Sequence, residues 1–154
     1  MAAYVQTRDL RARPVAPTEI ARRAERMLES LRLADAELSI VLCSDDVIHD
    51  LNRRYRHKNR PTDVLAFAMR EGEGGDLHEQ VLGDVIISLE TARKQALEQG
   101  RTIAFEVTFL LAHGLLHLLG YDHQTRDEER RMMAMTDVLV SAALPPRARR
   151  KRRS

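Results

Sequence analysis

Residues 110–123 read LLAHGLLHLLGYDH and place three of the chain's six histidines within eleven residues of its most apolar region. His113 and His117 are four residues apart, so a helix would carry both side chains on one face, one turn apart. Gly120 is a typical helix-ending residue, and a chain reversal there would bring His123 to the same point. Three imidazoles at this spacing predict a metal site on a central helix.

The composition of this predicted site favours a catalytic zinc centre. Three neutral nitrogen ligands without an obvious fourth leave one position for water, whose pKa falls to about 7 on zinc. Nickel and copper also bind such histidine sites. The alternative interpretations are hydrogen-bonded core histidines, or a structural metal with Cys43 as fourth ligand, although we expect that cysteine to be buried and inert. Asp122 and Glu106 are carboxylates that could orient a ligand, with a purely structural role as the equal alternative for each.

The predicted helix differs from the zinc-binding helix of a peptidase. Peptidases with the HExxH motif carry a glutamate directly after the first histidine, where it acts as general base. The corresponding residue here is Gly114, which we expect to leave space beside the first ligand. Because the ligand spacing is kept without the acid and base group, a zincin-like peptidase is the weakest interpretation.

Outward from this helix, hydrophobic periodicity and turn residues predict an α+β fold in one domain. We expect strands at about residues 4–7, 37–43, 63–69 and 82–89, and helices at about 16–33, 45–55, 89–99, 101–119 and 125–144. Pro17 fits a first helical turn, Ser44 and Ser88 fit N-caps, and Gly100 fits a helix end. The third and fourth strands are expected to pair across a glycine-rich connection.

Composition and charge exclude several classes of protein. A single cysteine and no recognisable signal peptide indicate a cytoplasmic protein, and the histidines within the apolar helix argue against a membrane span. The last eight residues, RARRKRRS, hold six of the 25 Lys and Arg residues. We therefore expect residues 1–144 to form the domain and residues 145–154 a disordered basic tail, which either contacts phosphates or only aids solubility.

The segment HGLLHLLGYDH, residues 113–123, matches in full the HGxLHLxGYDH signature and so resembles the YbeY family of bacterial rRNA-maturation endoribonucleases. LNRRYRHKNRPTDVLAF at residues 51–67 and LGDVIIS at residues 82–88 are similar to two further family segments. The resemblance implies a small mixed four-stranded sheet with one antiparallel strand, packed by about five helices. It also implies a single-strand-specific, metal-dependent endoribonuclease that matures the 3′ end of small-subunit (16S) rRNA and serves ribosome quality control.

The resemblance further implies particular residues and partners. By motif position, the zinc ligands are His113, His117 and His123, and Arg56 is a catalytic arginine that engages phosphate. The implied partners are single-stranded RNA, the small ribosomal subunit, one of its proteins and the Era GTPase, with neither DNA nor membrane expected. This chain departs from the family pattern at His57 and Asn59, and at residues 66–68. A zinc-containing ribosome assembly factor that does not cut RNA is the alternative.

Overall fold

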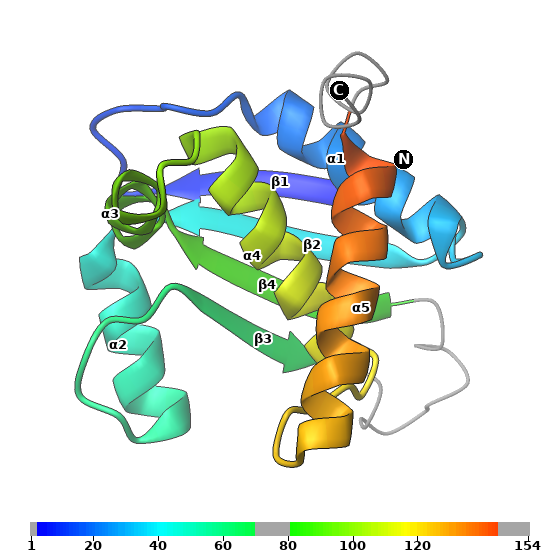
Figure 1. Cartoon of the computed structure of the whole chain (residues 1–154). Coiled ribbons are helices and arrows are strands. Elements are labelled where there is room, and N and C mark those ends of the chain that lie inside the picture. The colour runs from blue at the N-terminus through cyan, green and yellow to red at the C-terminus, as the bar shows by residue number, and fades with distance from the viewer. Residues whose placement is uncertain (1–2, 70–80, 145–154) are drawn as a thin grey trace.

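Figure 1 shows the computed structural model, which describes residues 3–69 and 81–144. Its four strands are β1 (Ala3–Arg8), β2 (Glu37–Cys43), β3 (Val64–Ala68) and β4 (Val81–Ser88). They form one sheet in the order β1-β2-β4-β3, in which β1, β2 and β4 run parallel and β3 pairs antiparallel with β4. The mixed sheet with one antiparallel strand is confirmed, and β3 occupies an edge of it.

Five helices pack around the sheet in the described part of the chain: α1 (Pro17–Ser30), α2 (Asp45–Arg56), α3 (Leu89–Gln99), α4 (Ile103–Leu118) and α5 (Arg126–Ala143). Figure 1 shows α1, α4 and α5 on one face of the sheet and α2 at the side of β3. The predicted α+β fold is therefore confirmed. The expected basic tail, residues 145–154, and the glycine-rich connection lie outside the described residues.

Local signals set the helix boundaries. The Ser44 and Ser88 hydroxyls accept hydrogen bonds from the backbone N–H groups of Val47 and Thr91, at 3.3 and 3.2 Å, as N-cap residues do. Gly100 ends α3 in the left-handed conformation, with φ of 66°. Helix α4 begins after Thr102, two residues later than the predicted boundary, because that hydroxyl caps it.

The two faces of the sheet are buried to different extents. Alternate strand residues such as Ile40 and Val85 point into the larger core beneath α1, α4 and α5. Their neighbours Val41 and Ile86 point to the opposite face, where a smaller cluster packs against α2. Helix α4 carries three completely buried leucines, Leu111, Leu115 and Leu116, and Leu118 is only 2% exposed. This burial confirms that α4 lies at the centre of the fold.

Among the described residues, none of the helices combines the length and apolar character that crossing a bilayer would require.

Candidate metal centre and adjoining groove

The three histidines converge because α4 ends in a turn that reverses the chain. Gly120 has a φ of 96°, in the left-handed region, and its N–H donates to the carbonyl of His117 at 3.0 Å. The next N–H, that of Tyr121, reaches back to the carbonyl of Leu116, also at 3.0 Å. This pair of bonds is the common glycine-terminated helix end. It returns the chain toward α4 and brings His123 beside the helix, as the sequence predicted.

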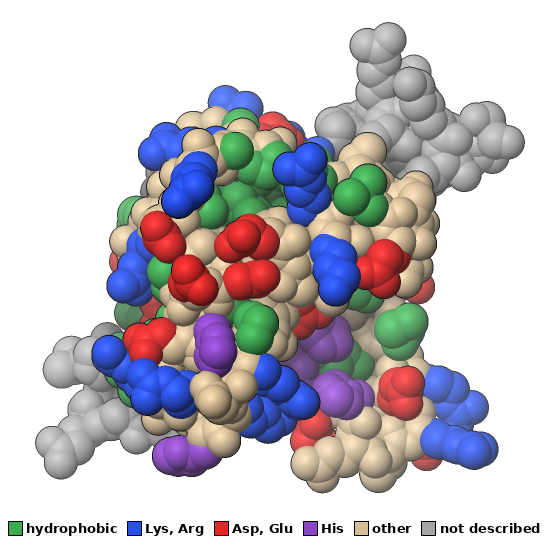
Figure 2. Space-filling view, turned by 90° about the vertical axis from the view of Figure 1, so that its left-hand side faces the viewer, with side chains coloured by type: hydrophobic (Ala, Val, Ile, Leu, Met, Phe, Trp, Pro, Cys, Tyr) green, Lys and Arg blue, Asp and Glu red, His purple; other side chains and the backbone are tan. Residues whose placement is uncertain are grey.

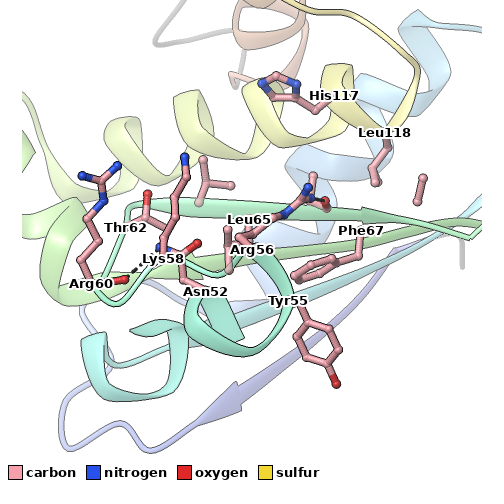
Figure 3. Close-up of a pocket in the computed structure, with 13 residues that line it drawn as sticks. Asn52, Tyr55, Arg56, Lys58, Arg60, Thr62, Leu65, Phe67, His117 and Leu118 are labelled. Carbon is pink, nitrogen blue, oxygen red and sulfur yellow. Dashed lines mark hydrogen bonds between the residues drawn. The ribbon is translucent and has the colours of Figure 1, made fainter. Parts of the chain in front are cut away.

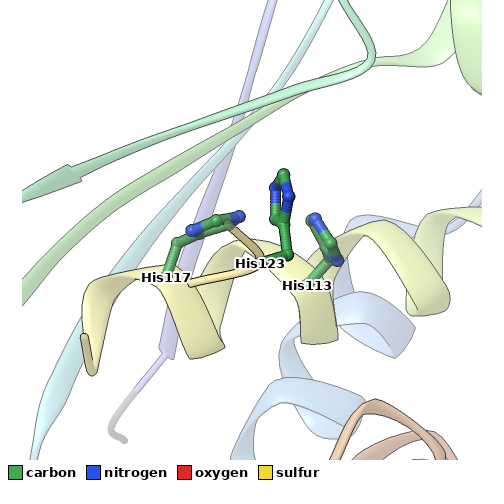
Figure 4. A group of neighbouring side chains, drawn as sticks. All are labelled: His113, His117 and His123. Carbon is green, nitrogen blue, oxygen red and sulfur yellow. The ribbon is translucent and has the colours of Figure 1, made fainter. Parts of the chain in front are cut away.

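Figure 4 shows the three imidazoles facing a common point. One nitrogen from each of His113, His117 and His123 lies within 4.8 Å of the other two. The ring centroids of His113 and His117 are 4.9 Å apart, and those of His117 and His123 are 5.5 Å apart. Three imidazoles so placed can bind one transition-metal ion, and the cluster contains no fourth His, Cys, Asp or Glu among the described residues.

The surroundings of the cluster keep two of its imidazoles neutral. Burial lowers the pKa of His113, and the positive charge of neighbouring His117 lowers it further. Burial likewise lowers the pKa of His117, and the positive charge of His123 lowers it further. A neutral imidazole offers the nitrogen lone pair that a metal ion needs, so the site is prepared for metal at neutral pH.

A stack of side chains supports the first ligand. The ring of Phe109 lies nearly parallel to that of His113, with centroids 6.4 Å apart and an interplanar angle of 19°. The guanidinium of Arg101 covers Phe109 at 5.2 Å and donates to the buried Glu106 carboxylate at 3.1 Å. Glu106 is thus bonded to Arg101, and Asp122 accepts the backbone N–H of His123 at 2.7 Å.

Cys43 is excluded from the cluster by its position on the opposite face of the sheet. It is completely buried in the smaller core cluster beside Ile48 and Ile86. Burial raises the pKa of its thiol to about 12. The expectation of a buried, inert cysteine is confirmed, and a closed structural site with Cys43 as fourth ligand is wrong.

Gly114 lies where α4 packs against the sheet. A methyl group on this residue would lie 2.7 Å from Val85 Cγ1 and 3.2 Å from Val64 Cγ2, so position 114 faces the sheet. The glycine therefore allows α4 to approach β3 and β4 closely, whereas space beside the first ligand stays a prediction. A glutamate here would meet packed valines, which explains in structural terms why the HExxH pattern is absent.

A groove with a volume of about 730 Å³ extends from His117, one member of the metal cluster, to the basic segment after α2. His117 contributes to one wall, and Arg56, Lys58 and Arg60 contribute to the other. Figure 3 shows these side chains around the groove, and Figure 2 shows histidine side chains in a hollow with Lys and Arg side chains beside it. No local pattern predicts that Lys58 and Arg60 share a groove with His117, since a run of basic residues is typical of a solvent-exposed segment.

Arg56 is held at the edge strand by two contacts. Its Nη2 donates to the carbonyl of Ala66 at 2.6 Å, and its guanidinium lies 5.1 Å from the ring centroid of Phe67. This carbonyl is available because no other strand in the described part of the chain pairs with the outer side of β3. Asn59, by contrast, is hydrogen-bonded to His49 at 2.8 Å. Arg56 and His117 both line the groove, whereas Asn59 does not.

Comparison with known proteins identifies the family of the chain. A family model described as Endoribonuclease YbeY matches residues 6–143. The chain is 47% identical over 126 residues to Endoribonuclease YbeY of Geobacter metallireducens, covering 80% of this chain and 84% of that one. It is 46% identical over 113 residues to the Bacillus subtilis protein of the same name, covering 70% and 72% of the two chains.

A solution structure of a Thermotoga maritima protein shares the fold, with a TM-score of 0.63 at 24% identity, over 92% of this chain and 88% of that one. The match to the family model begins within β1 and includes the other three strands, the five helices and all three histidines. The chain therefore belongs to the YbeY endoribonuclease family.

Proposed function

We propose that this chain is a single-strand-specific, metal-dependent endoribonuclease that matures the 3′ end of small-subunit (16S) rRNA and takes part in ribosome quality control. The observation that carries the proposal is one groove lined both by Arg56 and by His117 of the three-histidine cluster. The relatives named Endoribonuclease YbeY support RNA as the substrate. A metal centre beside a basic groove suits the hydrolysis of a phosphodiester.

Zinc is the metal we propose, held by His113, His117 and His123. The donor set fits it, because the three nitrogens converge from one face and the imidazoles of His113 and His117 are kept neutral by burial. When bound, the ion supplies Lewis-acid polarisation of a phosphoryl oxygen and lowers the pKa of water. Nickel and copper are the alternatives for this set of ligands.

Arg56 is proposed as the catalytic residue that binds the phosphate. Its contacts with the Ala66 carbonyl and with Phe67 fix the plane of the guanidinium. One N–H is used by that carbonyl, so the remaining donors of the fork are available for the charge that accumulates on the phosphate. Lys58 and Arg60 extend the positive wall and would hold adjacent phosphates of the strand.

We base the proposed cellular location and binding partners on membership of the YbeY family. We place the protein in the cytoplasm, on the small ribosomal subunit, with the Era GTPase as a further partner and with neither DNA nor membrane as a binding target. Residues 1–144 would form the nuclease domain, and the basic residues 145–154 would act as a disordered arm that contacts RNA phosphates.

The experiment that tests the proposal combines metal analysis with cleavage of a single-stranded RNA that spans the 3′ end of 16S rRNA. Wild type should contain one zinc ion and cut the RNA. His113→Ala should lose both metal and cleavage, whereas Arg56→Ala should keep the metal and lose cleavage. Bound zinc without cleavage, even on ribosomal particles, would favour the non-cutting assembly factor instead.

A further inference from the structure

The groove beside the metal cluster continues past Arg56. Tyr55, the preceding residue, lies near the end of α2 with 62% of its surface exposed. Tyr55 and Phe67 line both this groove and a second hollow of about 430 Å³. The second hollow lies on the face of the sheet that α2 only partly covers, where Arg8 of β1 and Asp84 of β4 also line it. The two hollows therefore meet at the Tyr55–Phe67 pair.

The two aromatic rings are arranged differently. Phe67 is partly buried, and the guanidinium of Arg56 lies 5.1 Å from its centroid. Tyr55 meets Phe67 edge to face, with centroids 5.6 Å apart and an interplanar angle of 67°. Such a contact orients the ring of Tyr55 while leaving most of it exposed. A held but uncovered aromatic ring is suited to stacking on another flat group.

We propose that Tyr55 stacks on an unpaired base of an RNA strand that passes from the metal groove, across the edge strand β3, onto the open face of the sheet. The inference rests on the proposed function and extends it by defining where the substrate runs beyond the cleaved bond. Single-stranded nucleic acid is typically bound by cationic grooves that follow the phosphates and by aromatic rings that stack on the bases.

Charge identifies RNA as the occupant. The path from the first hollow to the second passes Lys58, Arg60, Arg56 and Arg8, so each hollow offers a cation to the phosphates. Among the described residues that line the two hollows, Asp84 is the one acidic residue. The stacking site also accounts for the preference for single strands that we propose, because both faces of a base are already covered within a duplex.

A double-mutant cycle between protein and RNA tests the inference. Binding of a ten-nucleotide uridine RNA, and of an abasic ribose-phosphate strand of the same length, would be measured by fluorescence anisotropy. The full chain would be kept in chelator so that the RNA stays intact. The variants are Tyr55→Ala, Tyr55→Phe and, as a matched control, Tyr4→Ala. Tyr4 is an exposed tyrosine, at 53%, that lines neither hollow. Thermal unfolding would confirm that each variant is folded.

We expect Tyr55→Ala to bind the uridine RNA about tenfold more weakly, which is the usual effect of one lost stacking contact. It should bind the abasic strand as wild type does. Tyr55→Phe and Tyr4→Ala should be unchanged on both strands. Equal weakening of Tyr55→Ala on both strands, or no weakening on either, would overturn the stacking role. If neither strand were bound more weakly, the exposed ring of Tyr55 would instead be assigned to contact with a protein partner. Cleavage by wild type tests the proposed function separately, so the two failures are distinguishable.

Discussion

Gly114→Ala tests the close approach of α4 to the sheet, on which the geometry of the metal cluster depends. The added methyl group would lie 2.7 Å from Val85 Cγ1 and 3.2 Å from both Val85 Cγ2 and Val64 Cγ2. Carbon atoms in contact prefer about 3.5 to 4.0 Å, so the helix or the valine must move by about 1 Å. Valine is stiff at χ1, and both it and Gly114 are buried.

Two opposing effects determine how much Gly114→Ala changes the free energy of unfolding. Overpacking of a buried contact costs about 1 to 3 kcal/mol. Replacing an interior helical glycine by alanine contributes about 1 kcal/mol in the opposite sense. The net change in the single variant is therefore small, but a double-mutant cycle with Val85→Ala separates the two effects. The gain in helix propensity is the same in both backgrounds and cancels, whereas the clash with Val85 disappears in the double variant.

Urea unfolding of wild type, the two single variants and the double variant gives the coupling free energy. Val85→Ala alone should destabilise the protein by about 2 kcal/mol, because it removes buried methyl groups. The double variant should be more stable than the sum of the singles predicts, by about 1 to 3 kcal/mol. Gly114→Ala alone should also weaken zinc binding, since His113 and His117 move with α4.

Additive free energies in this cycle would refute the argument, because they would mean that a methyl group at position 114 does not press on Val85. The clash with Val85 would also be refuted if Gly114→Ala alone were more stable than wild type by about 1 kcal/mol and bound zinc with unchanged affinity.

Three further predictions concern the metal cluster and the buried cysteine on the opposite face of the sheet. Phe109→Ala should weaken zinc binding several-fold in competition with a chromophoric chelator, because His113 loses its stacked neighbour; an unchanged affinity would show that the stack does not hold the ligand. Cys43 should resist alkylation at pH 8 until the protein is unfolded, since burial raises its pKa to about 12; rapid alkylation of folded protein would contradict this. The metal-free protein should lose stability as the pH falls below about 6.5, down to the lowered pKa values of His113 and His117, because the unfolded chain then binds protons that the folded chain does not. Urea midpoints that are the same at pH 7.5 and 5.5 would rule this out.

The features that the sequence predicted correctly are those determined by residues close together in the chain. The i, i+4 spacing of His113 and His117 fixes their common face, and Gly120 fixes the turn that returns His123 to them. The caps at Ser44 and Ser88 are likewise local, because each hydroxyl bonds a backbone N–H three residues further on. Short-range geometry of this kind is readable from a single sequence.

The features that were missed depend on how the elements pack. The packing role of Gly114 was not predicted, because the valines it contacts, Val64 and Val85, lie on strands far from it in sequence. The sequence near a helical glycine does not indicate which neighbouring element packs against it, because that depends on where the sheet lies. Tyr55 was missed for the same reason, since its exposure matters only once β3 brings Phe67 beside it.

The edge position of β3 connects these observations. Because β3 runs antiparallel to β4, it starts opposite the end of that strand, where the N–H of Ser88 donates to the carbonyl of Asp63 at 3.0 Å. The chain must therefore return after α2 before β3 can begin. That return places Lys58 and Arg60 in one groove with β3 and His117, and the open edge leaves the Ala66 carbonyl free to hold Arg56. A parallel strand at this edge would begin at the other end of the sheet and would remove this return. The basic wall and the metal cluster are thus brought together by the direction of a single strand, which explains why neither segment predicts the groove by itself.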